Sequence, residues 1–173
     1  LSARAYVDQY VIVDTGSTDG TQEIIQRTMR GMPGCLTDRE FVDFAASRNT
    51  ALDLAAGAPE PAVFTLFLSG YEVLCEGRAL REFLEAQRDT TGSDAFNVEI
   101  RMEGKSWPYP RVLRNGSPWR YVGKLHEQPV KDGKTHPPDG ATVSRTYIRH
   151  DVSDPNKRNI TLLETHIPIL EQA

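Results

Sequence analysis

A short strand-turn-helix segment near the start of the chain constrains the fold more than any other feature. Val11-Ile12-Val13 is a continuous β-branched run, which is typical of a strand buried on both faces. It ends at Asp14 and passes into residues 15–20, which are dense in turn formers and helix caps. Residues 21–30 then carry apolar side chains at helical spacing. A strand that enters a helix through such a turn predicts an α/β sheet, with a ligand site beyond the carboxyl ends of its strands.

A second helix is expected over residues 42–56, with Gly57 placed to end it. At ~100° per residue, Arg48 falls on the same side as the apolar Phe44 and Leu52. A guanidinium on a buried face must be paired or must reach a polar cavity, because leaving it unpaired costs much free energy. We therefore expect Arg48 either to form a structural ion pair or to line a binding site.

The rest of the chain predicts a mainly β second half. Apolar residues 63–68 form a strand that runs into the turn Ser69-Gly70-Tyr71-Glu72. Alternation over residues 96–102 is typical of a half-buried antiparallel strand. The remaining expected elements are a helix at 78–88, strands near 112–113, 121–122 and 142–148, a surface loop at 131–140 and a final helix at 160–170. The predicted fold class is α/β, a nucleotide-binding sheet flanked by helices with an antiparallel C-terminal extension, in one domain.

Composition excludes several function classes. The net charge of −4, without a block of Lys or Arg, argues against a nucleic-acid partner. Cys35 and Cys75 lack the spacing of metal ligands and indicate free thiols in a reducing compartment. No apolar run approaches the ~18 residues of a membrane span. These features favour a cytoplasmic location.

Several segments together resemble one known family. The turn "VIVDTGSTDGT" resembles that of the bacterial family 2 glycosyltransferases with the GT-A fold, whose members carry V-V-D-T-G-S-T-D-G-T. "DFAASRNTAL" is similar to their F-x-x-A-R-N-x-A-L helix, and "FTLFLSGYEVL" to their strand W-I-L-x-L-D-A-D-E-x-L. Three later segments are similar too: "PRVLRNGSPWRYVGKLHEQPV", "YIRH" and "KRNITLLE". The likeness runs in order over most of residues 8–164.

The resemblance implies a GT-A-like domain over residues 1–173, with a nucleotide-binding half at about 1–75 and an acceptor half at 76–173. It implies an inverting hexosyl transfer from a nucleotide-diphosphate sugar, such as a UDP-sugar, to a hydroxyl of a glycan, lipid or protein. By motif position, Glu127 would be the general base, and His126 a diphosphate donor or metal ligand. The implied substrate-binding residues are Asp14, Ser17, Asp19, Arg48, Asn49, Ser69, Tyr71 and Glu72.

The turn at residues 69–72 departs from this pattern. The family places two aspartates, the D-x-D pair that binds Mg²⁺ or Mn²⁺, at Ser69 and Tyr71. A hydroxyl and a phenol are poor ligands for hard cations. Three alternatives stay open: a metal-independent site, weak metal binding through Glu72 and His126, or loss of catalysis. The last would leave a binding module for a nucleotide, a glycan or a protein on the same fold.

A second departure lies at the N-terminus. The family opens with a strand and helix before the turn, whereas this chain has only residues 1–9 there. Either the chain lacks a companion segment, or the nucleotide pocket is incomplete. An unpaired neighbouring strand favours association, with a second copy or with another chain.

Overall fold

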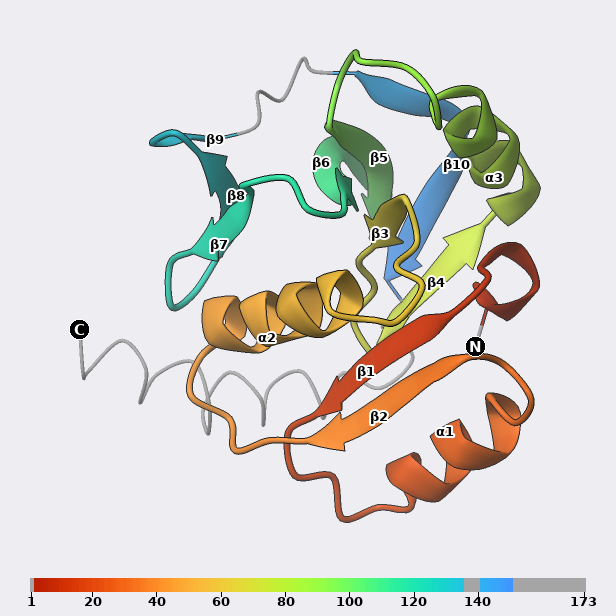
Figure 1. Cartoon of the computed structure of the whole chain (residues 1–173), viewed down its shortest axis with the longest axis vertical. Helices are drawn as coiled ribbons and strands as arrows, with labels where there is room; N and C mark the ends of the chain where they lie inside the picture. The colour runs from red at the N-terminus through yellow and green to blue at the C-terminus, as the bar shows by residue number, and fades with distance from the viewer. Residues whose placement is uncertain (1, 136–140, 151–173) are drawn as a thin grey trace.

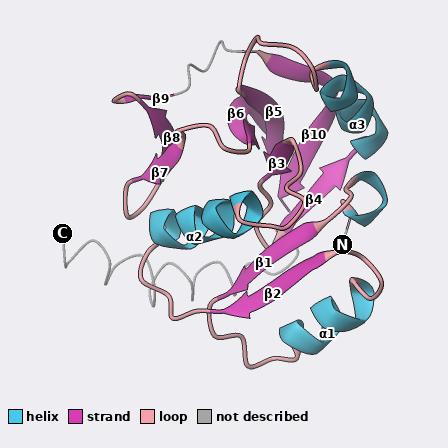
Figure 2. Ribbon diagram, in the orientation of Figure 1, coloured by secondary structure: helices cyan, strands magenta, loops and turns pink. Residues whose placement is uncertain are grey.

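The computed structural model describes residues 2–135 and 141–150. It is a mixed α/β structure with three α-helices among these residues (Figure 1, Figure 2). The helices are α1 (Thr21–Thr28), α2 (Phe44–Ala56) and α3 (Gly77–Ala86), and a 3₁₀ turn, η1, spans Arg4–Tyr6. No helix in this part of the chain is long and apolar enough to cross a membrane.

The strands form three separate sheets. A parallel pair is made by β1 (Tyr10–Asp14) and β2 (Gly34–Asp38). A five-stranded sheet has the order β3-β6-β5-β10-β4, built from β3 (Phe64–Leu66), β4 (Glu72–Cys75), β5 (Ala95–Met102), β6 (Lys105–Arg114) and β10 (Thr142–His150). An antiparallel three-stranded sheet contains β7 (Arg120–Val122), β8 (Gln128–Lys131) and β9 (Lys134–Thr135).

The five-stranded sheet holds the main core. Residues 95–98 of β5 are buried on both faces, whereas Glu99 is half-buried and Arg101 is exposed, so the expected half-buried strand describes only its second half. Helix α3 packs against β10 and contributes Leu80 to this core, which also contains Leu74, Ile100, Val112, Val143 and Ile148. Strands β5 and β6 are antiparallel, as the alternating pattern predicts.

Helix α2 connects the parts of the fold. Its N-cap Asp43 accepts a hydrogen bond from the amide of Ala46 at 2.7 Å, which fixes the start of the helix. The helix packs against β1 and also against β7 (Figure 1). Ala45 and Leu52 enter a second apolar cluster with Phe67, Ala95, Leu113, Trp119 and Tyr121. This cluster lies under the polar site described below.

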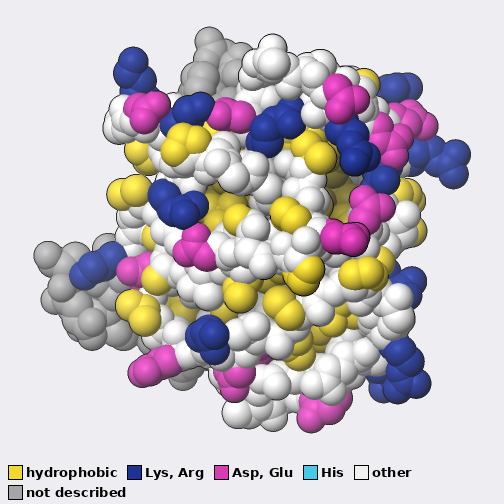
Figure 3. Space-filling model, viewed as in Figure 1, with side chains coloured by type: hydrophobic (Ala, Val, Ile, Leu, Met, Phe, Trp, Pro, Cys, Tyr) yellow, Lys and Arg dark blue, Asp and Glu magenta, His cyan; other side chains and the backbone are white. Residues whose placement is uncertain are grey.

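The expectation that β1 is buried on both faces is wrong. Val11, Ile12 and Val13 are half-buried, so the strand is not covered on both faces. It pairs with β2 on one side, and among the described strands it has no partner on the other. Hydrophobic side chains show on the surface over this part of the molecule (Figure 3). The β-branched run predicted the strand correctly but not its surroundings.

Other differences concern short elements. The structure adds β2 between the first two helices and β4, which begins at the last residue of the 69–72 turn, and neither strand was predicted. The expected loop at 131–140 begins instead as a hairpin between β8 and β9, and residues 136–140 lie outside the described part. The expected helix at 160–170 and the "KRNITLLE" segment also lie outside it.

Candidate functional site

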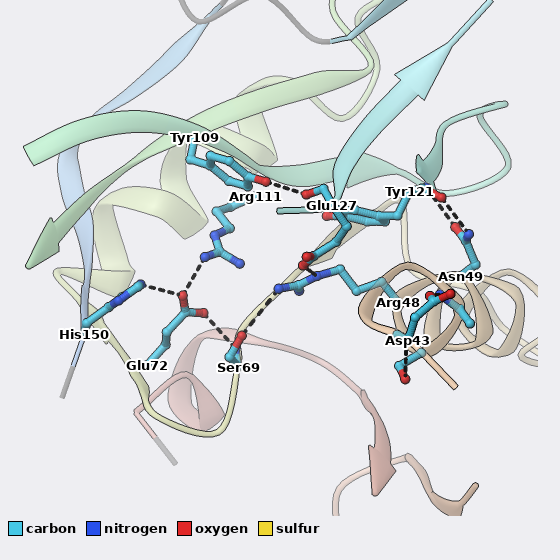
Figure 4. Close-up of polar contacts among 12 residues, drawn as sticks. Asp43, Arg48, Asn49, Ser69, Glu72, Tyr109, Arg111, Tyr121, Glu127 and His150 are labelled. Carbon is cyan, nitrogen blue, oxygen red and sulfur yellow. Dashed lines mark hydrogen bonds and ion pairs between the residues drawn. The ribbon is translucent and has the colours of Figure 1, made fainter. Parts of the chain in front are cut away.

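The centre of the site is an ion pair between two residues far apart in the sequence. Nε of Arg48, from α2, lies 2.5 Å from Oε1 of Glu127, which directly precedes β8 (Figure 4). The two side chains are 17% and 11% exposed. Nη2 of Arg48 also donates to Oγ of Ser69 at 3.4 Å. Arg48 therefore connects the helix, the 69–72 turn and the segment before β8.

A second ion pair adjoins the first through Ser69. The carboxylate of Glu72 is fully buried and lies 2.5 Å from Nη2 of Arg111 and 2.9 Å from Nε2 of His150. Its other oxygen accepts a hydrogen bond from the amide of Ser69 at 2.7 Å. Arg111 and the amide of Ser69 hold Glu72 in place by hydrogen bonds, and the His150 ring lies against the same carboxylate (Figure 4).

The buried phenol of Tyr121 and the half-buried phenol of Tyr109 border the ion pairs. Burial raises the pKa of Tyr121 and of Tyr109 above the ordinary value of a phenol, so both stay protonated at neutral pH. The Tyr109 hydroxyl donates to the backbone carbonyl of Glu127 at 2.6 Å. Cζ of Arg48 lies 5.3 Å from the centre of the Tyr121 ring. Burial alone would lower the pKa of Arg48, but the carboxylates of Glu127 and Glu72 raise it, so this guanidinium stays charged.

Aromatic side chains continue the site toward solvent. Tyr71 is 56% exposed, and its ring contacts that of His150 edge-to-face with the ring centres 5.2 Å apart. The Trp107 ring lies 6.5 Å from the His150 ring. Tyr71, which replaces an expected aspartate, therefore presents an apolar ring beside Glu72 and not a metal ligand.

Asp14 lies in its own turn and not among these ion pairs. Its Oδ1 accepts hydrogen bonds from the amides of Gly16 and Ser17 and from the side chain of Gln22, at 2.8 to 3.0 Å. Although burial opposes it, hydrogen bonding from Ser17, Gln22 and Gly16 lowers the pKa of Asp14 to about 2. Asp19 accepts from the amide and hydroxyl of Thr21 at the start of α1.

The structure thus brings together four of the site residues that the resemblance implies, Arg48, Ser69, Glu72 and Glu127. Asp14, Ser17 and Asp19 belong to the neighbouring turn after β1.

Asn49, which the resemblance implies as a substrate-binding residue, forms two hydrogen bonds with the backbone of β7. Its side-chain nitrogen donates to the Tyr121 carbonyl, and its side-chain oxygen accepts from the Tyr121 amide, both at 2.9 Å. With both polar atoms used in this way, Asn49 joins α2 to β7. It positions Arg48, the preceding residue.

The predicted metal ligands do not form a metal site. His126 is exposed with a left-handed φ of 55°, and no ion pair joins it to Glu72. Both oxygens of Glu72 already have partners. No group of three His, Cys, Asp or Glu side chains within residues 2–135 and 141–150 could hold a metal ion. The residues present do not fit Mg²⁺ or Mn²⁺, which prefer several carboxylate oxygens.

Sequence reasoning missed Arg111, a buried partner of Glu72. The sequence did contain a sign of its burial. Arg111 directly precedes the apolar Val112-Leu113 of a predicted strand, just as Arg48 lies among the apolar residues of its helix. A buried arginine requires a partner.

Comparisons with known proteins identify no family. No protein-family model matches the chain, and a search of curated proteins finds no match either.

Proposed function

We propose that this chain is an inverting glycosyltransferase-like domain on a GT-A-like fold, which takes a nucleotide-diphosphate sugar as donor and a hydroxyl as acceptor. The observation that carries the proposal is the meeting of Arg48, Ser69 and Glu127 within hydrogen-bonding distance. These residues come from three segments that each resemble a motif of that family. No family-model match supports the assignment, so its support is this geometry and the motif likeness.

The chemistry assigned to these residues is an in-line displacement. The acceptor oxygen forms a bond to the anomeric carbon, and the bond from that carbon to the diphosphate oxygen breaks. A carboxylate must take the proton of the acceptor, and Glu127 is the least enclosed acid of the ion-paired cluster. The leaving diphosphate gains negative charge, which the guanidinium of Arg48 is placed to stabilise. Because the residues do not fit a metal, no step is assigned to one.

A second candidate is a non-catalytic binding module on the same fold. It is favoured by the replacement of both expected aspartates and by the ion pairing of both central glutamates, Glu72 and Glu127. A module of this kind would bind a nucleotide or a glycan without transfer.

Calorimetry with UDP tests the proposal, first in EDTA and then with Mn²⁺. We expect UDP to bind in both conditions, and Arg48→Ala to weaken binding by about tenfold or more, since a hydrogen bond to a charged group is lost. A matched control is Arg120→Ala, because Arg120 pairs with the exposed Asp53. Absence of UDP binding would contradict the transferase.

Hydrolysis of a panel of UDP-sugars separates the enzyme from the module. Turnover by the natural chain, abolished in Glu127→Gln, supports the transferase. Turnover only in Ser69→Asp/Tyr71→Asp would show that the natural chain has lost catalysis and would favour the module.

A further inference from the structure

The Arg48–Glu127 ion pair raises a question about anion binding. Two arginines, Arg48 and Arg111, are matched by two glutamates, Glu127 and Glu72. The cluster therefore offers no excess positive charge to an incoming phosphate from these four side chains. An anion can gain a full ion pair here only if one carboxylate leaves its arginine.

Glu127 is the carboxylate that can leave. The Glu72 side chain has no exposed area, accepts hydrogen bonds from Arg111 and the Ser69 amide, and is in contact with His150. Within the described residues, the carboxylate of Glu127 has Arg48 as its one ion-pair partner and is 11% exposed. Its backbone is held by Tyr109, so the side chain can rotate away without moving the strand.

The Tyr121 hydroxyl points to the same movement. Tyr121 is only 3% exposed, and its hydroxyl has no hydrogen-bond partner among the described residues. Its ring lies beside Arg48 and Glu127 (Figure 4). A buried hydroxyl without a partner is costly, so the paired arrangement is not the best one for Tyr121. A diphosphate, which has more oxygens than the carboxylate it displaces, can offer this hydroxyl an acceptor.

We propose that Glu127 occupies the phosphate-binding position of Arg48 as a built-in competitor, and that a diphosphate releases it on binding. The inference rests on the proposed function for its biological meaning. It implies an order of binding, in which the donor comes before the acceptor. The donor diphosphate first pairs with Arg48, and only then is Glu127 free to accept a proton. An acceptor that arrived first would meet a base still paired with arginine.

If Glu127 competes with the ligand for Arg48, neutralising Glu127 should strengthen ligand binding, whereas the loss of an ordinary binding residue would weaken it. Glu127→Gln keeps the size of the side chain and removes its charge, so it should bind pyrophosphate and UDP more tightly, by about tenfold. The experiment is calorimetry in EDTA with each ligand, on the natural chain and on three variants. Asp53→Asn is the matched control, because it removes one negative charge from the helix that carries Arg48, out of an exposed pair with Arg120. Glu127→Gln/Arg48→Ala should lose the whole gain.

The outcomes are distinguishable. Tighter binding of both ligands in Glu127→Gln, but not in Asp53→Asn, supports the competition. UDP binding that is unchanged or weaker in Glu127→Gln overturns it and leaves the transferase proposal standing. Pyrophosphate binding that tightens without any UDP binding supports the competition and removes the nucleotide-sugar function. Equal gains in Glu127→Gln and Asp53→Asn would reduce the effect to net charge and overturn the competition.

Discussion

Asp14 shows how one residue at the end of a strand can be fixed by its own turn. Two backbone amides and one amide side chain converge on one carboxylate oxygen, so the charged form is favoured over the protonated form. Its pKa is lowered from 3.8 to about 2. The stabilisation is therefore present at pH values above the unfolded pKa and is lost as the pH falls through the folded value.

The lowered pKa of Asp14 leads to the first prediction. Asp14→Asn should lower the free energy of unfolding at pH 7 by about 1–2 kcal/mol, because the charge that the amides stabilise is removed. The difference from the natural chain should shrink as the pH falls from about 4 to about 2. Urea unfolding at several pH values measures it. A difference that persisted unchanged at the lowest pH would contradict the account.

The buried pair of Arg111 and Glu72 supports a second prediction. The two side chains are 7% and 0% exposed. Arg111→Leu should destabilise the fold by about 3–5 kcal/mol, since it leaves Glu72 buried with less compensation. Arg111→Leu/Glu72→Leu should recover much of the loss, because no charge is then stranded. Chemical unfolding of the three proteins checks this, and equal losses in the single and double variants would count against it.

At the scale of elements, α2 is attached to β7 by apolar packing, by an exposed ion pair and by the side chain of Asn49. Asn49 bridges both backbone polar groups of Tyr121. Asn49→Ala should cost about 2 kcal/mol of stability and also weaken UDP binding, because the same attachment positions Arg48. Thr50→Ala is the control, since the Thr50 hydroxyl donates only to Ala46 in its own helix. Urea unfolding and calorimetry measure the two effects, and an equal response of both variants would refute the bridging role.

How far the sequence predicts these elements depends on how local their causes are. Helix α2 was expected because its apolar spacing and the Gly57 stop act within the segment. Strand β2 was missed because Gly34, Cys35 and Thr37 give no strong strand pattern, and its pairing with β1 determines it. Strand β4 was missed for the same reason, since it pairs with β10, whose residues lie far along the chain.

The site was partly predictable for a related reason. Arg48 could be recognised because its charge interrupts an apolar helix face. Since burying an unpaired guanidinium costs much free energy, an ion-pair partner for Arg48 was expected. That this partner is Glu127 follows from no local pattern, because 79 residues separate them. The hydrogen bonding of the Asn49 side chain is likewise determined by its contact with β7, a distant part of the sequence. Motif likeness located these residues but did not specify their hydrogen bonds.

At the scale of the whole molecule, burial is distributed unevenly between the sheets. In β5, Ala95, Val98 and Ile100 are at most 1% exposed, whereas β1 is half-buried over Val11, Ile12 and Val13. The β1–β2 pair has no strand linking it to the five-stranded sheet among the described residues. Helix α2 contacts β1 and is the described element that ties this pair to the site.

Local opening should therefore begin at β1–β2. Native-state hydrogen exchange should show the slowest amides in the buried stretches of β5 and β6, residues 95–98 and 110–113, because both strands are paired on both sides. The amides of β1 and β2 should exchange at a lower free energy than the global unfolding reaction. Adding UDP tests the link to function: a ligand held by Arg48 on α2 should protect β1 as well, since α2 packs on that strand. Equal protection of β1 and β5 without ligand would show that the two sheets open as one unit.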